Sequence, residues 1–284
     1  MWQSFVRSWI QQQVHQSAAE ALRARREGPS AETDQPQLPC DVGVVFALGI
    51  ESGGLEDLLQ EAVTTNACGV KLRQGKLGGR VVVVAEAGLG SKAAAAGTQV
   101  LIAGHRPSWL ISAGFAGGLD GRLRRGDIVM ANALIDRDGR RLAIDLKLDP
   151  EKTAASKGLH IGPCVTTDRI LYRPDDKRRL GEKSQALAVD MESWAVGDVC
   201  RQSKTPFLAV RIISDAVDDE LPPDVEALAR QTSVAGRFGA VAGAVFRRPS
   251  SIKDMLKLRE DALVLSDRLA RFLAGVIEQL PQSK

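Results

Sequence analysis

The sequence has little of what a nucleic-acid-binding surface requires. Among 284 residues there are one Tyr and seven Phe, and the Lys and Arg residues form no long cluster. Aromatic stacking platforms and a basic groove are therefore not expected. The net charge of only +3 adds no strong attraction for a polyanion. We expect no nucleic-acid partner.

Metal-binding and disulfide patterns are missing as well. The cysteines are far apart, none forms a C-x-x-C pair, and the three histidines are scattered. The cysteines are Cys40, Cys68, Cys164 and Cys200. This pattern predicts reduced, mostly buried thiols and no metal site.

Long apolar runs are also absent. No stretch reaches 18 consecutive apolar residues, so no membrane-spanning helix is predicted. The N-terminus lacks a compact apolar core followed by a small-residue cleavage site, which argues against a signal peptide. These features predict a cytoplasmic protein.

Residues 1–27 have apolar side chains at helical spacing, and Gly28-Pro29 would end that helix. The polar, proline-containing residues 28–39 indicate a linker, so we expect residues 1–39 to stand apart from a domain over residues 40–284. The apolar stripe would dock on its own domain or on a second subunit. Alternatively, its Trp and Arg residues would let it lie on a membrane surface.

The rest of the chain alternates short apolar runs with helical stretches. Residues 80–87 contain four consecutive valines, which indicates a strand buried on both faces. Further strands are predicted over residues 42–48, 107–113, 127–134, 160–166, 186–191 and 207–213. Helices are predicted over residues 91–103, 173–184, 193–203 and 252–280. This alternation predicts a layered α/β domain.

Two glycine-rich turns follow predicted strands. Gly88-Leu89-Gly90 opens a helix and fits G-x-G-x-x-A, but no acid ends the next strand to hold an adenine ribose. The Walker spacing is absent as well, so we expect no nucleotide cofactor. The turn at Gly88, and the run of residues 112–119 with Gly114, would instead offer backbone N–H groups to a ligand or simply make tight turns.

Carboxylates follow several of the predicted strands. Residues 187–193 and 210–215 are largely apolar runs that end in acids, and Glu51 follows the first strand. Ligands of open α/β folds bind at the carboxyl ends of strands. The pattern therefore predicts a site of converging carboxylates.

These motifs, in this order, resemble the purine nucleoside phosphorylase and uridine phosphorylase superfamily. The resemblance covers residues 41–280 and rests on the turns and acidic strand ends given above. Within the superfamily, methylthioadenosine/S-adenosylhomocysteine nucleosidases and hopanoid-associated phosphorylases are most similar. The resemblance implies a three-layer αβα sandwich around a mixed, partly barrel-like sheet, in addition to the N-terminal helix. It also implies a homodimer, or a larger oligomer, that cleaves the N-glycosidic bond of a purine nucleoside.

The resemblance assigns a role to each acid. Asp215 matches the residue that protonates the departing purine at N7, which needs surroundings that favour its protonated form. Glu192 would accept hydrogen bonds from the ribose hydroxyls, with Met191 packed on the sugar. Glu51 would orient or deprotonate the attacking water, and Arg211 would support the acids.

The resemblance also places Gly88, Gly114, Ser214 and Ile170 among the substrate-binding residues. Ile170 stands where an aromatic side chain usually stacks on the purine, which weakens the case for adenine. Each residue also has a purely structural interpretation. Asp215 could cap a helix, Glu192 could be a first-turn acid, Met191 could be core and Glu51 could be a solvated loop residue.

The first loop, residues 47–53, contains Glu51 and no Arg. A phosphorylase needs cations for its phosphate, and an acid would repel that anion. We therefore expect a hydrolase that releases adenine from 5′-methylthioadenosine or S-adenosylhomocysteine. A phosphorylase acting on a 5′-modified adenosine and a nucleoside-binding protein without activity are the alternatives.

Overall fold

A computed structural model describes residues 39–146, 158–221 and 251–281. The predicted helix over residues 1–27 and nearly all of the linker that follows it lie outside these ranges. The boundary between a separate N-terminal segment and the domain over residues 40–284 therefore stays a prediction.

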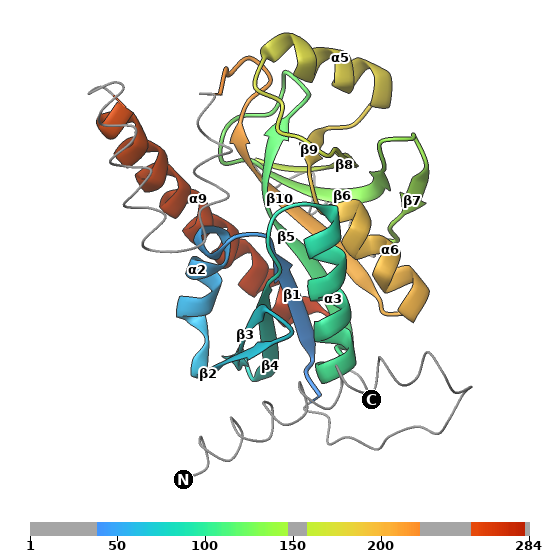
Figure 1. Ribbon diagram of the computed structural model, residues 1–284, viewed down its shortest axis with the longest axis vertical. Helices are drawn as coiled ribbons and strands as arrows, with labels where there is room; N and C mark the ends of the chain where they lie inside the picture. The colour runs from blue at the N-terminus through green and yellow to red at the C-terminus, as the bar shows by residue number, and fades with distance from the viewer. Residues whose placement is uncertain (1–38, 147–157, 222–250, 282–284) are drawn as a thin grey trace.

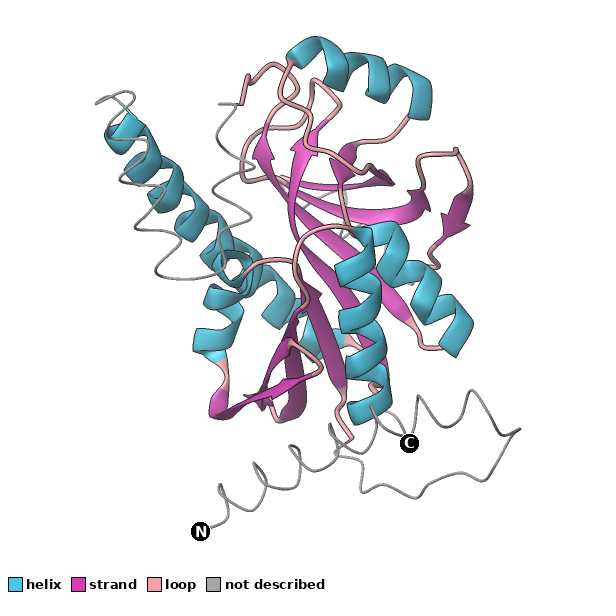
Figure 2. Cartoon of the chain, in the orientation of Figure 1, coloured by secondary structure: helices cyan, strands magenta, loops and turns pink. Residues whose placement is uncertain are grey.

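One mixed sheet of ten strands forms the centre of the described chain (Figures 1 and 2). The order is β10-β6-β8-β9-β5-β1-β4-β3-β2, with β7 on the side of β6. The strands are β1 (Val42–Phe46), β2 (Gln60–Ala67), β3 (Val70–Leu77), β4 (Arg80–Glu86), β5 (Trp109–Gly118), β6 (Ile128–Ile135), β7 (Arg141–Ala143), β8 (Leu159–Thr166), β9 (Ala188–Asp190) and β10 (Phe207–Asp215).

Half of this sheet closes on itself. Strand β10 pairs in parallel with β5 and antiparallel with β6, while β9 joins β5 to β8. The pairing of β6 with β8 completes a ring of five strands. This closure gives the sheet the partly barrel-like form that the resemblance implied.

Helices cover both faces of the open half (Figure 1). Helices α2 (Gly49–Leu58) and α9 (Ser251–Gln279) lie on one face of it and α3 (Ser91–His105) lies on the other, while α6 (Ser193–Ser203) packs on the closed half and α5 (Pro174–Ser184) lies over the end of β10. Val44 and Phe46 of β1 share a core with α2 and α9, whereas Val45 packs in a second core with α3 and α6. Because successive side chains of a strand point to opposite faces, β1 is buried between two helical layers. The three-layer αβα prediction is confirmed.

Strands β4 and β5, which α3 connects, both run parallel to β1, which lies between them. One expectation was wrong, and one pair of strands was missed. The glycine-rich run after residue 113 is not a loop, since β5 continues to Gly118 by pairing with β9 and β10. The hairpin of β2 and β3 was not predicted, because β2 is a mostly exposed, polar edge strand without an apolar repeat.

No helix among the described residues is long and apolar enough to cross a membrane.

Candidate active site

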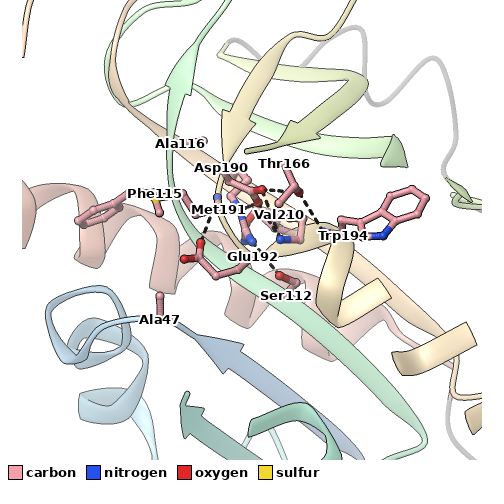
Figure 3. A network of polar contacts seen from close by, with 12 residues as sticks. Ala47, Ser112, Phe115, Ala116, Thr166, Asp190, Met191, Glu192, Trp194 and Val210 are labelled. Atoms are coloured by element: carbon pink, nitrogen blue, oxygen red, sulfur yellow. Dashed lines mark hydrogen bonds and ion pairs between the residues drawn. The ribbon is translucent and has the colours of Figure 1, made fainter. Parts of the chain in front are cut away.

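Carboxylates and an arginine meet in one small cavity beside the carboxyl end of β1 and the middle of β5 and β10. Its lining includes Glu51 from α2, Glu192 from the turn after β9, and Arg211 from β10. Gly114 and Phe115 of β5 also line the cavity. Figure 3 shows Glu192, Ser112 and Phe115 around this region. Of the three acids predicted to converge, Glu51 and Glu192 line this cavity together with Arg211, whereas Asp215 does not.

Glu51 is held by three backbone donors. Its Oε2 accepts hydrogen bonds from the N–H groups of Ala47 (3.2 Å) and Leu48 (2.9 Å), and its Oε1 accepts one from Phe115 (2.8 Å). The Leu48 bond caps α2, but the Phe115 bond comes from another strand, so Glu51 is more than a helix cap. Burial raises the pKa of Glu51, against the opposing effects of these donors and Arg211.

Glu192 is fixed by the glycine turn at the start of α3. The Gly90 N–H donates to Glu192 Oε1 at 2.8 Å, and the Ser91 hydroxyl donates to the Met191 carbonyl at 3.1 Å. Burial, with the negative charges of Asp190 and Glu51, raises the pKa of Glu192 to about 7. Glu192 thus stays near the balance between its two protonation states at neutral pH.

Arg211 is buried and makes three different contacts. Its Nε donates to Asp190 Oδ2 at 2.6 Å, its Nη2 donates to the Ser112 hydroxyl at 2.7 Å, and its Nη1 donates to the Val210 carbonyl. Asp190 in turn accepts a hydrogen bond from the Thr166 hydroxyl. The oxygen of that hydroxyl accepts a hydrogen bond from the backbone N–H of Trp194 (Figure 3). The guanidinium is therefore anchored to β5 and β9 while one side of it faces the cavity.

Asp215 lies at the end of β10 beside Gly117 of β5 and is not part of the cavity lining. Its Oδ1 accepts a hydrogen bond from the Ser214 hydroxyl at 2.6 Å. Its Oδ2 lies 2.5 Å from Lys177 Nζ, in an ion pair that is not aligned as a hydrogen bond. The carboxyl group of Asp215 is therefore in contact with one ammonium group and one hydroxyl group.

Residues 41–247 match the family model of the phosphorylase superfamily. The chain belongs to this superfamily. The 5′-methylthioadenosine/S-adenosylhomocysteine nucleosidase of Aeromonas salmonicida is 30% identical to it over 226 residues, which are 70% of this chain and 95% of that protein. The nucleosidase of the same name from Colwellia psychrerythraea is 30% identical over 212 residues, or 65% of this chain and 87% of that protein.

The fold of this superfamily member is shared with solved structures. The Helicobacter pylori 5′-methylthioadenosine/S-adenosylhomocysteine nucleosidase superposes with a TM-score of 0.67 at 18% identity, covering 86% of this chain and 100% of that one. The S. pneumoniae enzyme of that name gives 0.65 at 18% identity, over 84% of this chain and 99% of that one.

The remaining predicted site residues, Met191, Ser214, Gly88 and Ile170, each have a different setting in the structure. Met191 precedes Glu192 and is half-buried, and Ser214 bridges Asp215 and the Ala116 carbonyl. Gly88 uses its N–H for the Ala47 carbonyl, so that group is not free for a ligand. Ile170 is half-buried in the segment after β8 and does not line the cavity.

Sequence reasoning missed the supporting polar groups of this superfamily member. Phe115 contributes its backbone N–H, which every residue type except proline would supply. Ser112 and Asp190 hold Arg211. Asp190 could have been found from its place at the end of a predicted strand, two residues before Glu192.

The raised pKa of Glu192 predicts a pH dependence for this superfamily member. Glu192→Gln should lower kcat/KM and should remove the part of the expected fall in wild-type activity that comes from protonation of Glu192 as the pH drops through about 7. Because the folded state binds this proton more tightly than the unfolded chain, wild-type stability falls as the pH rises from about 4.5 to about 7. The variant should therefore be more stable at pH 8, by up to about 3 kcal/mol.

Urea unfolding between pH 5 and 8, with parallel kinetics, checks this prediction. The exposed Glu182→Gln on α5 is the matched control and should follow the wild type. Equal pH slopes for the wild type and Glu192→Gln would contradict the assignment.

Proposed function

We propose that this protein is a purine nucleosidase that hydrolyses the N-glycosidic bond of an adenine nucleoside such as 5′-methylthioadenosine or S-adenosylhomocysteine. The observation that carries the proposal is the meeting of Glu51 and Glu192 in one cavity, with Asp215 nearby on the adjoining strand pair. The names of the relatives, which are nucleosidases for these two compounds, support the choice of substrate.

Glu51 is suited to act on water. A carboxylate has about four acceptor positions, and three of those on Glu51 are taken by backbone N–H groups. The remaining one can accept a proton of the attacking water as the C1′–O bond forms and the C1′–N9 bond breaks. Burial, which raises the pKa of Glu51, makes it a better base near neutral pH.

Glu192 acts on the sugar side of the breaking C1′–N9 bond, and Asp215 acts on the purine side. The Glu192 carboxylate accepts hydrogen bonds from the backbone N–H groups of Gly90 (2.8 Å) and Met191 (3.3 Å), so about two of its four acceptor positions are left for the 2′ and 3′ hydroxyls of ribose. Met191 packs against the sugar. Asp215 faces the departing purine and gives N7 the proton that it gains as the C1′–N9 bond breaks, and the proton that Glu51 took from water later restores Asp215.

The charges in the cavity favour water over phosphate as the nucleophile. Its charged lining residues are Glu51, Glu192 and Arg211, and the Arg211 guanidinium is already paired with Asp190. Two carboxylates beside one neutralised cation would repel a phosphate dianion.

Product analysis tests the proposal. The wild type should release adenine from 5′-methylthioadenosine, S-adenosylhomocysteine or adenosine at the same rate with and without phosphate, together with the free sugar. Formation of a sugar 1-phosphate would identify a phosphorylase instead. Binding of these nucleosides without any product would identify a nucleoside-binding protein.

The proposal also covers the domain bounds, the oligomeric state and the location of the protein. We take residues 40–284 as the catalytic domain, which acts as a homodimer in the cytoplasm. Residues 1–39 provide the separate helix and linker, for which docking on the protein and contact with a membrane surface are both still predictions.

A further inference from the structure

Helix α2, which carries Glu51, has little stability of its own. It has ten residues, and Gly53 and Gly54 stand together in its middle. Each glycine in a helix interior costs about 1 kcal/mol relative to alanine, and isolated helices shorter than about 12 residues are marginal in water. The shape of α2, and with it the position of the Glu51 backbone, therefore depends on contacts with other elements.

One of these contacts is a single hydroxyl group of α9, the helix that packs against α2 (Figure 1). Ser266 Oγ donates a hydrogen bond to the Glu51 carbonyl at 3.1 Å and accepts one from the Gly54 N–H at 3.1 Å. A serine hydroxyl has one proton to donate and lone pairs that accept, so one side chain can serve both groups. Ser266 thus joins two points of the same turn of α2.

This hydroxyl is shielded from water. Ser266 is 1% exposed, and its neighbours in α9, Leu265 and Leu269, share a hydrophobic core with Leu55 of α2. A buried polar group that loses its partners costs about 1–3 kcal/mol. The two hydrogen bonds therefore favour one position of α2 relative to α9.

The two glycines of α2 differ in their surroundings. A Cβ on Gly54 would lie 2.9 Å from the Ser266 carbonyl oxygen and 3.1 Å from the Asp267 Cα. A Cβ on Gly53 would meet no atom within 4 Å. Because the backbone of α9 cannot turn aside as a flexible side chain could, only glycine at position 54 permits the close approach that both hydrogen bonds of Ser266 require.

We propose that Ser266 is a positioning residue for Glu51, which holds the first turn of α2 so that the Glu51 carboxylate points at the attacking water. This inference rests on the proposed function, because it concerns the base of that reaction. The N–H groups of Leu48 and Phe115 hold the carboxylate of Glu51. Ser266 holds the main chain of the same residue. With both ends fixed, the acceptor position left on the carboxylate keeps one direction.

Ser266→Ala tests this, because it removes the hydroxyl and adds no atoms. We expect kcat for 5′-methylthioadenosine to fall about tenfold with KM nearly unchanged, since a misplacement of 1 Å can cost about 100-fold. Ser203→Ala, at an exposed serine of α6, is the matched control and should leave both constants unchanged. Gly54→Ala should lower kcat as well, whereas Gly53→Ala should not.

The same substitution in a Glu51→Gln background separates positioning from a general loss of structure. If Ser266 acts through Glu51, adding Ser266→Ala to Glu51→Gln should change the residual kcat less than about twofold, because effects that act through one group are not additive. A further fall as large as in the wild-type background would mean that Ser266 only stabilises the fold, and the proposal would then be wrong. An unchanged kcat in Ser266→Ala alone would overturn it too.

Amide hydrogen exchange gives a readout that needs no activity. The N–H groups of Leu48 and Phe115 donate to the Glu51 carboxylate, so their exchange reports how firmly it is held. Both should exchange faster in Ser266→Ala than in the wild type, and at the wild-type rate in Ser203→Ala. Unchanged exchange at both groups would contradict the proposal. A wild type that cleaves no nucleoside would refute the proposed function, while the exchange rates would still show whether Ser266 holds Glu51.

Discussion

Glu51→Gln should lower kcat by about 100- to 10,000-fold, the range expected when a general base is removed. A carboxamide cannot take a proton from water at neutral pH. It would also turn an N–H₂ group toward backbone donors, because both Glu51 oxygens accept N–H bonds from Leu48 or Phe115. We expect an additional loss of about 1–3 kcal/mol in the free energy of unfolding, from one donor that is left unpaired.

Steady-state kinetics with 5′-methylthioadenosine, together with urea unfolding, measure both effects. Glu61→Gln in β2 is the control, because the Glu61 side chain is exposed and forms only a surface ion pair with Lys76. More than about a tenth of the wild-type kcat in Glu51→Gln would exclude Glu51 as the base.

Arg211→Met should have the largest effect on stability, about 3–5 kcal/mol, because it leaves the buried carboxylate of Asp190 without its cation. The Arg211 and Asp190 side chains are 2% and 1% exposed, so water cannot replace the lost partner. The Arg211 charge also lowers the pKa of Glu51 and of Glu192. Without it, the pH below which activity is lost should move upward.

Chemical unfolding checks the predicted loss of stability of Arg211→Met, and the pH profile of kcat/KM checks the predicted shift in its pH dependence. Arg211→Lys keeps the charge but loses the fork that reaches Ser112 and Asp190 together, so it should destabilise the protein less and leave the pH profile nearer to that of the wild type. A stability of Arg211→Met within about 1 kcal/mol of the wild type would contradict a supporting role.

Much of the site could be predicted because its residues follow apolar runs. Glu51, Glu192 and Asp215 each come where a strand ends, and the resemblance assigned their roles. Lys177 could not be found this way, since it stands in a run of charged residues that reads as a solvated helix face. Its burial depends on the position of α5 above the end of β10, which no local pattern contains.

The fold was predicted where both faces of a strand are apolar, as in β4. It was not predicted where pairing partners decide the conformation. The glycines of residues 114–118 have low intrinsic preference for strands, but β9 and β10 supply hydrogen bonds on either side of them. The edge strand β2 is polar on most of its length and is fixed by its hairpin with β3.

The five-strand ring has a consequence for how the chain reaches its native state during synthesis. Strand β10 fits between β5 and β6, although it is made about 90 residues after β5 and about 70 after β6. Until β10 emerges from the ribosome, both earlier strands have an open edge that can pair with another nascent chain. A shortened polypeptide that stops before Phe207 should therefore aggregate rather than form a smaller folded unit, and the catalytic centre can be assembled only late.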